Sequence, residues 1–582
     1  MSLVNFFRNL KPAPRMEAVP RKRVEFVDLT LRDGQQSLLA TRMSTDQVQR
    51  LLPLVLDTGI QLLEVWGGAT LDSAMRYLNE NPFTRLQKMS ETAKPYKAGL
   101  RALSRGQNLF GYDPYPDDIV RDFNREAVNA GVTVMRIFDA LNYTPNFKAA
   151  LDGVNEAGGT FDAAVCFTTG TPYNVDHFVQ KCLELERMGA HMVSDKDMAG
   201  LKTPVEAWEY YRALKKALKV PVVSHTHCTP GYGHISAVIA LLSGVDMIDT
   251  AFLPLAGGSS HPSIEIMSLF AEVLGIETGL DLSDKVLKPV HSEMRKVIDE
   301  IQQEFKIKIH RSVWPGREIL LPMVNDILHY LAKGKIEKAL QITHAMELAC
   351  GFPEPNIAVL NAQIPGGMYS NFVNQLSRDN KSEYLGRALE AVQEVRQKAG
   401  WCPLVTPTSQ IVGVKAYFTA MGKSANPVQY FNLIAGYYGK TPFPVDPDYR
   451  QEVCGFRDER EYDSSGFKRE IPIASETELP LAETVQEKLL YYLFPDSSGK
   501  SYLEGLRQAQ WSPVAEARQA EEEREQAGIR DKLVTNALMN RYADDMDSLS
   551  EKLSGVVANG DSFSEKVHEQ AEDSPGGPSA TV

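Results

Sequence analysis

Eight short apolar runs, separated by amphipathic segments, occupy the chain between Val24 and Leu253. Each run has the length of a buried strand, and each segment between runs can form one helix. Eight βα units of this size predict an α/β fold, a TIM (β/α)8 barrel, with its active site at the C-terminal ends of the strands. A doubly wound open sheet is the main alternative, which periodicity alone does not exclude. The runs are VEFVDL, QLLEVWG, YKAGLRAL, VMRIFDAL, TFDAAVCFTT, HMVSDKDM, VPVVSHTH and VDMIDTAFL.

Two of the amphipathic segments begin with a recognisable helix start. Ser44–Gln47 and Thr203–Glu206 are capping boxes, in which a hydroxyl and a Gln or Glu side chain satisfy first-turn amides. Pro204 stands at the first helical position of the second box. Both patterns therefore predict helices directly after apolar runs, as a βα repeat requires.

The pattern changes after about residue 280, where long helical stretches replace the alternation. We expect four segments: an N-terminal extension (1–23), the barrel (24–280), a mainly helical domain that completes the active site (281–493), and a polar tail, helical or disordered (494–582). Apolar residues recur at roughly helical spacing within 529–553. That part of the tail could dock a partner helix or form a solvated terminal helix.

Composition narrows the class of function. The chain has 62 basic and 75 acidic residues, a formal charge of −13 and no block of Lys or Arg, which argues against nucleic acid as the main partner. The six cysteines form no Cys-x-x-Cys pair, as is typical of a reducing compartment. No window reaches ~18 uninterrupted apolar residues, so we expect no transmembrane segment and a cytoplasmic protein.

Several polar residues with metal-ligand or anion-binding chemistry stand at the ends of the predicted strands. In a strand, His225 and His227 point to the same face, and Cys228 points to the other. A carboxylate, two imidazoles and a lysine on neighbouring strand ends suit a zinc-like ion, and the arginines suit a carboxylate substrate. The candidate residues are Arg32, Asp33, Gln36, Arg105, Gln107, Lys196, His225 and His227.

These motifs resemble the carboxyltransferase domain of the biotin-dependent pyruvate/oxaloacetate enzymes. That family includes pyruvate carboxylase, the α subunit of oxaloacetate decarboxylase and the large carboxyltransferase subunit of transcarboxylase. The resemblance runs in order from about residue 24 to 438. It rests on TLRDGQQSLLATRM, EVWGGATLDSAMRYLNENPFTRL, RGQNLFGY, RIFDALN, KDMAG, HTH, IPGGMYSN and LVTPTSQIVG.

The resemblance implies roles for individual residues. Asp33, Lys196, His225 and His227 would bind a divalent metal (Zn, Mn or Co), with Lys196 converted to an anionic carbamate because an ammonium cannot ligate a cation. Arg32, Gln36 and Arg105 would bind the substrate. Ser370 would relay a proton between the pyruvate methyl group and biotin. Ser370 could instead cap a helix that begins at Asn371.

The resemblance also implies a reaction and partners. CO2 would move between biotin and pyruvate or oxaloacetate, and the family suggests a homodimer. The printed sequence contains no Ala-Met-Lys-Met, the biotinylated motif of single-chain members, so we expect biotin on a separate carrier protein. Three alternatives remain at this point: the α subunit of a membrane-coupled oxaloacetate decarboxylase, an acyl-CoA lyase or isopropylmalate-type synthase, and a degenerate scaffold without activity.

Four positions depart from the family pattern. Gln35 replaces a histidine, Cys228 replaces an aspartate, Tyr143 replaces an acidic residue, and Asp195 replaces an apolar residue before Lys196. All of them leave the candidate ligands and arginines in place. By strand alternation, Asp195 would point outward beneath the helices, where a carboxylate is costly unless paired, and the sequence offers no partner for it.

Overall fold

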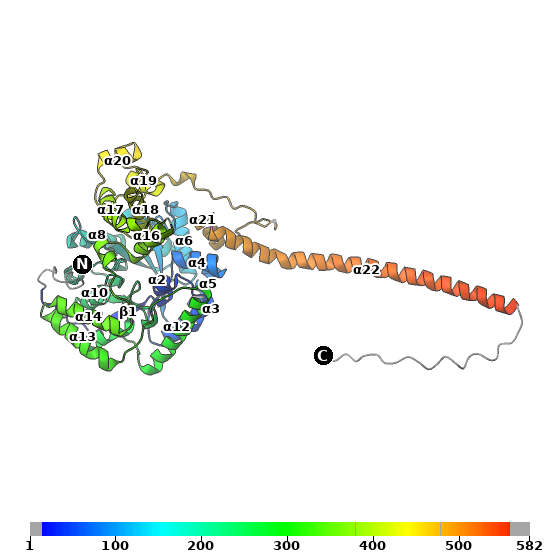
Figure 1. The fold of residues 1–582 in the computed structure, drawn as a ribbon, viewed down its shortest axis with the longest axis horizontal. Helices are drawn as coiled ribbons and strands as arrows, with labels where there is room; N and C mark the ends of the chain where they lie inside the picture. The colour runs from blue at the N-terminus through cyan, green and yellow to red at the C-terminus, as the bar shows by residue number, and fades with distance from the viewer. Residues whose placement is uncertain (1–13, 379, 476, 478, 559–582) are drawn as a thin grey trace. The chain divides into compact units, whose positions relative to one another are not determined.

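The structure is a computed structural model that describes residues 14–378, 380–475, 477 and 479–558 (Figure 1). It forms two compact units, Met1–Glu504 and Gly505–Val582, and each is considered by itself. Within the described residues, no helix is both long and apolar enough to cross a membrane.

Eight parallel strands close into a barrel in chain order, which confirms the predicted TIM barrel and excludes the open sheet. The barrel closes where β1 pairs with β8, with Glu25 opposite Met247 and Asp28 opposite Thr250. All eight predicted runs supply a strand. The strands are β1 (Glu25–Asp28), β2 (Leu62–Trp66), β3 (Gly99–Arg105), β4 (Val134–Phe138), β5 (Thr160–Cys166), β6 (Met192–Asp197), β7 (Val222–Thr226) and β8 (Met247–Thr250).

Helices between the strands form the outer layer of the barrel. Both predicted capping boxes are present: Ser44 caps α3 and Thr203 caps α9, each with the reciprocal side-chain bond from the third helical residue. The helices are α2 (Gln35–Leu39), α3 (Thr45–Leu56), α4 (Gly68–Leu78), α5 (Pro82–Ala93), α6 (Asp117–Asn129), α7 (Lys148–Glu156), α8 (Val175–Met188), α9 (Pro204–Ala217), α10 (Gly233–Leu242) and α11 (Ile264–Val273).

The barrel interior is layered. Near the N-terminal ends of the strands it is apolar, with a cluster that includes Val27, Val134 and Val223. Above this cluster lies a fully buried layer of charge contributed by β2, β3, β4, β5 and β8. Its members contact one another across non-adjacent strands, so they lie inside the barrel: Glu64, Arg101, Arg136, Asp162 and Asp249.

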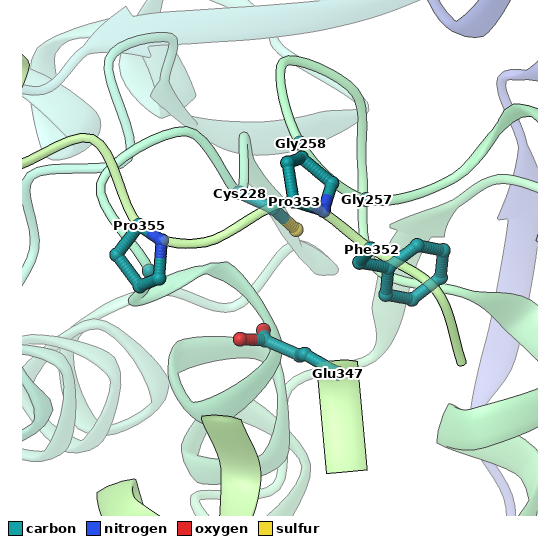
Figure 2. A pocket seen from close by; sticks show the side chains of 8 residues that line it. Cys228, Gly257, Gly258, Glu347, Phe352, Pro353 and Pro355 are labelled. Atoms are coloured by element: carbon teal, nitrogen blue, oxygen red, sulfur yellow. The ribbon is translucent and has the colours of Figure 1, made fainter. Parts of the chain in front are cut away.

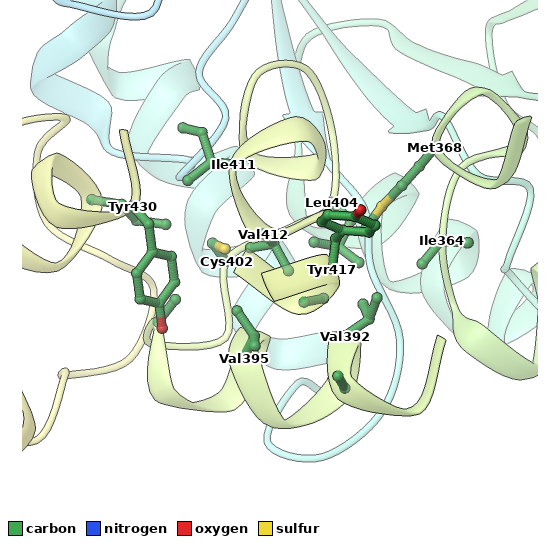
Figure 3. Packing of buried hydrophobic residues seen from close by; sticks show 14 of the residues in the cluster. Ile364, Met368, Val392, Val395, Cys402, Leu404, Ile411, Val412, Tyr417 and Tyr430 are labelled. Atoms are coloured by element: carbon green, nitrogen blue, oxygen red, sulfur yellow. The ribbon is translucent and has the colours of Figure 1, made fainter. Parts of the chain in front are cut away.

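The remainder of the first unit is helical. Figure 1 shows α16 to α20 grouped on one side of the barrel. A buried apolar cluster that includes Val392, Val412 and Tyr417 forms the core of this group (Figure 3). The helices are α12 (Asp284–Phe305), α13 (Arg317–Ala332), α14 (Ile336–Ala349), α15 (Ile357–Ala362), α16 (Gly366–Arg378), α17 (Leu385–Lys398), α18 (Thr408–Ala420), α19 (Val428–Ala435), α20 (Pro447–Cys454) and α21 (Val485–Leu493).

Contacts from this helical group reach the C-terminal ends of the barrel strands. Val405 packs against Phe138 at the end of β4 and Cys166 at the end of β5. The Arg396 guanidinium donates to Thr168 Oγ1 (2.6 Å), just beyond β5. Since the strand ends carry the candidate site, the helical group covers the same face of the barrel.

One long helix, α22 (Ser498–Ala558), continues into the second unit. Within that unit, seven large apolar side chains are at least half exposed: Ile529, Leu533, Val534, Leu538, Met539, Met546 and Leu549. They fall in the segment that the sequence offered as a docking helix or a solvated terminal helix.

Candidate active site

A tight turn directly after β1 carries two of the candidate residues. Residues Thr30–Gly34 form a π-helical turn, a geometry that recurs at functional sites, and α2 follows at once. A Cβ atom at Gly34 would lie 3.2 Å from the Leu255 carbonyl oxygen, so the close approach of the two loops favours glycine here. Arg32 and Asp33 are buried in this turn.

Three imidazoles converge on Asp33: His225, His227 and His261. All four residues are buried, and one ligand atom from each lies within 4.8 Å of the others. His225 stands on β7 and His227 directly after it, whereas His261 comes from the loop that follows β8. Two of the three histidines were predicted from the sequence, and the third was not.

Each of the three imidazoles is held through its Nδ1 atom. His225 Nδ1 lies 2.8 Å from Asp249 Oδ2, His227 Nδ1 lies 2.7 Å from the Ser259 carbonyl oxygen, and His261 Nδ1 lies 2.9 Å from the Thr226 carbonyl oxygen. A carboxylate or carbonyl can only accept, so each Nδ1 carries a hydrogen and each Nε2 is the atom that faces Asp33. Those Nε2 atoms lie 3.9, 3.8 and 3.2 Å from Asp33 Oδ2, respectively.

The electrostatics favour metal-binding protonation states. Burial would raise the pKa of Asp33, but the neighbouring Arg32 guanidinium lowers it well below its usual range, so the carboxylate is ionised. Burial lowers the pKa of His227 to about 3, which leaves a neutral imidazole. Burial and the neighbouring Lys196 hold the pKa of His225 well below its usual value. An anionic oxygen and neutral imidazole nitrogens are the forms that bind a divalent cation.

Lys196 lies inside the barrel beside these ligands. Its Nζ atom lies 3.1 Å from His225 Nε2 and 5.5 Å from the centre of the Phe138 ring. Burial lowers the pKa of Lys196 to about 8. A neutral amine is the form that reacts with CO2, so the environment suits carbamate formation.

The two candidate substrate arginines differ in their partners. The Arg32 guanidinium contacts Glu64 and lies 2.7 Å from Asp33 Oδ2, and its Nη1 donates weakly to Gln36 Oε1 (3.4 Å). Arg105 stands at the end of β3, and no carboxylate among the described residues lies within ion-pair distance of it. Burial lowers the pKa of Arg105 to about 10, so it is still cationic at neutral pH. Arg105 is therefore the guanidinium with charge to offer an anionic ligand.

Ser370 lies in the first half of α16, whose first residue is Gly366. The suggested cap of a helix beginning at Asn371 is therefore wrong, because the preceding glycines already have helical geometry. The Ser370 side chain lies outside the described residues. The start of α16 is close to the histidine loop: a Cβ atom at Gly366 would lie 3.0 Å from Thr229 Cγ2, two residues beyond His227.

The departures from the family pattern have structural roles. Gln35 is buried; its amide donates to the Leu31 carbonyl oxygen (3.0 Å) and accepts from the Met43 amide (3.1 Å). The Tyr143 ring packs against Gly439, where a Cβ atom would lie 2.4 Å from it. Asp195 has the partner that the sequence did not provide, because Lys202 forms a buried ion pair with it.

Cys228 is a buried thiol that lies away from the histidine cluster. It lines a small cavity of about 10 Å³ together with Gly257, Glu347 and Phe352 (Figure 2), roughly the room of one water molecule. The Cys228 thiol lies 3.7 Å from His234 Nδ1, but that nitrogen donates to Glu347 Oε1 (2.7 Å) and His234 Nε2 accepts from the Ser263 amide (3.1 Å). Burial raises the pKa of the Cys228 thiol, which keeps it protonated. The expectation that Cys228 serves packing agrees with this arrangement.

Sequence reasoning missed His261 and the charged layer beneath the site. His261 stands in GGSSHPS, a βα loop at the C-terminal face, and its place in such a loop was the available signal. Asp249 touches His225 Nδ1, and Arg101 and Arg136 in turn contact Asp249. No local pattern marks these three residues, because each stands within a predominantly apolar run and its partner lies on another strand.

Fold and site together define a TIM-barrel protein with a cluster of candidate metal ligands at the C-terminal face. A family profile described as a conserved carboxylase domain matches residues 359–538. The chain is 34% identical over 433 residues to a pyruvate carboxylase subunit of Methanocaldococcus jannaschii, and this match covers 74% of the chain and 68% of the relative. It is 34% identical over 487 residues to the 2-oxoglutarate carboxylase large subunit of Hydrogenobacter thermophilus, with 82% of the chain and 67% of the relative covered.

Two further comparisons also match this chain to carboxyltransferases. The methylmalonyl-CoA carboxyltransferase 5S subunit of Propionibacterium freudenreichii is 31% identical over 440 residues, with 75% of this chain and 77% of the relative covered. The carboxyltransferase domain of Rhizobium etli pyruvate carboxylase, solved with pyruvate, covers 88% of this chain and 79% of its own at a TM-score of 0.65 and 25% identity. The chain belongs to the family of biotin-dependent pyruvate/oxaloacetate carboxyltransferases, as the motifs predicted, and is an enzyme of that class.

Proposed function

We propose that this chain transfers CO2 between biotin on a separate carrier protein and pyruvate or oxaloacetate, at a divalent metal site. The observation that carries the proposal is the convergence of Asp33 with the neutral imidazoles of His225 and His227, beside Lys196. In this proposal Asp33, His225, His227 and carbamylated Lys196 hold Zn, Mn or Co.

The donor set supports a metal on physical grounds. His227 Nε2 is buried and has no hydrogen-bond partner within the described part of the chain. A buried nitrogen without a partner costs about 1–3 kcal/mol, which a bound cation would offset. When bound, such a cation would supply a Lewis acid that stabilises the negative charge developing on an enolate oxygen.

Arg105 is proposed to bind the carboxylate of the 2-oxo acid. Its guanidinium can form two parallel charge-assisted hydrogen bonds, and no carboxylate among the described residues competes for it. Arg32 and Gln36 are proposed to orient the keto group from the turn after β1. Since Arg32 also contacts Asp33, it links the bound substrate to the ligand set.

The proposed proton path uses the Ser370 hydroxyl. In the carboxylation direction, carboxybiotin releases CO2, the pyruvate methyl group loses a proton through Ser370 to the biotin ureido nitrogen, and the enolate carbon attacks CO2 to give oxaloacetate. Ser370→Ala should abolish this turnover and leave metal content unchanged. Full activity in that variant would overturn the role.

Biotin in trans is supported by the family's dependence on biotin and by the absence of Ala-Met-Lys-Met in the printed sequence. Two measurements address it. The chain co-expressed with a biotin ligase should give no avidin signal at its own mass. A pull-down from native extract should recover a different, biotinylated polypeptide; biotin on this chain itself would refute the proposal.

The reaction is tested with the purified chain, free biotin and oxaloacetate. We expect biotin-dependent release of CO2 and pyruvate that stops when metal is removed by a chelator and returns with Zn²⁺, Mn²⁺ or Co²⁺. Because one relative at 34% identity is a 2-oxoglutarate carboxylase large subunit, the carboxylation product of 2-oxoglutarate is the second substrate to test. Metal-independent or biotin-independent turnover would contradict the proposal.

A further inference from the structure

We infer that His261 is a further protein ligand of the metal, so that Asp33 and three imidazoles hold the ion whether or not Lys196 is carbamylated. This inference rests on the metal site of the proposed function and adds a ligand to it. His261 is fully buried, and its Nε2 atom is the nearest of the three imidazole nitrogens to Asp33 Oδ2, at 3.2 Å.

The other ring nitrogen of His261 is already engaged. Its Nδ1 atom donates to the Thr226 carbonyl oxygen (2.9 Å), so Nε2 is the atom that faces Asp33. It is buried and has no hydrogen-bond partner within the described residues, as is also true of His227 Nε2.

The His261 Nε2 atom and the Asp33 carboxylate face each other at 3.2 Å, and both belong to the buried group whose ligand atoms lie within 4.8 Å of one another. The Asp33 carboxylate already accepts from Arg32 through the same oxygen (2.7 Å), and that hydrogen bond leaves the imidazole without a partner among the described residues. A divalent ion coordinated by Asp33 and His261 together would satisfy both atoms, as it would the imidazoles of His225 and His227.

The loop that carries His261 is fixed to the end of β7. The Cys228 amide donates to the Ser260 carbonyl oxygen (2.9 Å), and His227 Nδ1 donates to the Ser259 carbonyl oxygen (2.7 Å). Thr226 in turn accepts from His261. The two loops thus hold His227 and His261 against each other, with ring centres 4.3 Å apart. A ligand set locked before the ion arrives loses little conformational entropy on binding.

Lys196 stands at the edge of this set. Its Nζ atom contacts His225 Nε2 alone among the three imidazoles (3.1 Å), whereas the ligand atoms of Asp33 and the three histidines lie within 4.8 Å of one another. Four protein ligands of nitrogen and oxygen type satisfy a zinc-like ion. A carbamate on Lys196 would then be an added ligand that tunes the site for turnover, and its loss would leave the ion in place.

The test begins with the wild-type chain, freed of metal by a chelator and reloaded with Zn²⁺. X-ray absorption at the zinc edge counts imidazole ligands directly, and we expect three. Competition with a chromophoric chelator then gives the affinity of wild-type, His261→Ala, His261→Gln, Lys196→Ala and His234→Gln chains. His234 is the matched control, since it is equally buried but hydrogen-bonded at both ring nitrogens.

We expect both His261 variants to bind Zn²⁺ at least about 100-fold more weakly, and Lys196→Ala and His234→Gln to stay within about 10-fold of wild type. Circular dichroism establishes that each variant is folded, and the imidazole count needs no variant. Two imidazoles in the wild type, or unchanged affinity in His261→Ala, would overturn this inference alone. A wild-type chain that binds no divalent metal would overturn the metal-dependent function as well.

Discussion

Lys202 and Asp195 form a fully buried ion pair in the layer between the barrel and its outer helices. The Tyr211 hydroxyl also donates to the Asp195 carboxylate (2.7 Å), and the Lys202 ammonium lies 4.2 Å from the centre of the Phe167 ring. Asp195 precedes Lys196 on β6, so the pair anchors the outer face of the strand whose inner face enters the site.

Removing one partner of this pair should destabilise the protein more than removing both. Lys202→Met leaves a buried, uncompensated carboxylate and should cost about 3–5 kcal/mol in the free energy of unfolding. The double variant Lys202→Met with Asp195→Leu should recover most of that loss, because two apolar residues replace two charges. Urea denaturation measures both, and a double variant no more stable than the single would contradict this account. The exposed pair Lys148–Asp152 is the control, expected to give under about 1 kcal/mol.

Arg105 and Arg32 should separate substrate binding from metal binding. Arg105→Ala should raise KM for oxaloacetate by about 10–100-fold, the loss of a charge-assisted hydrogen-bonded pair, with metal affinity unchanged. Arg32→Ala should change both quantities, because Arg32 contacts Asp33. Steady-state kinetics measures KM for oxaloacetate, and a zinc titration measures metal affinity. Arg212→Ala, on an exposed helix surface, serves as the control; an unaltered KM in Arg105→Ala would rule out its proposed role.

Asp249 should position His225 for the metal. Asp249→Asn weakens the acceptor that fixes the hydrogen on His225 Nδ1, so metal affinity should fall by about 10–100-fold. Asp162→Asn is closely matched: it removes a carboxylate from the same buried layer and from the same Arg136, but Asp162 has no contact with His225. Equal metal affinities in the two variants would show that Asp249 affects metal binding through its charge and not by orienting the His225 ring.

Asp28 should make the stability of the barrel depend on pH. Burial raises the pKa of Asp28 to about 7, although Thr30 donates to it from its amide and hydroxyl. A carboxyl group whose folded-state pKa is raised binds its proton more tightly in the folded protein, so stability is lost as pH rises toward that value. Between about pH 5.5 and pH 8 the loss from this group should be roughly 2 kcal/mol. Urea denaturation at the two pH values measures this loss, and Asp28→Asn should not show it. If the free energy of unfolding changed equally with pH in the variant and the wild type, the role of Asp28 would be contradicted.

Local sequence information was sufficient for the barrel and for most of the site. The apolar runs end in TLRDG, KDM and HTH, and chain order alone brings the ends of parallel strands to one face. Alternation within a strand also separated Lys196, which faces inward, from Asp195, which faces outward. These properties depend on a residue and its immediate neighbours, and they can be read along the chain.

The partners of buried charges depended on the closed barrel. His261 reaches His227 only because the loop after β8 returns across the end of β7, and Arg101 meets Asp249 only because the strands close into a ring. Lys202 meets Asp195 because the turn after β6 folds back beneath α9. The sequence by itself determined the eight strands, the motif of the family and the candidate ligands on or just after β1, β6 and β7. Tertiary structure decided the third imidazole and the pairing of the buried charges, because those contacts join residues whose separation along the chain carries no periodic signal.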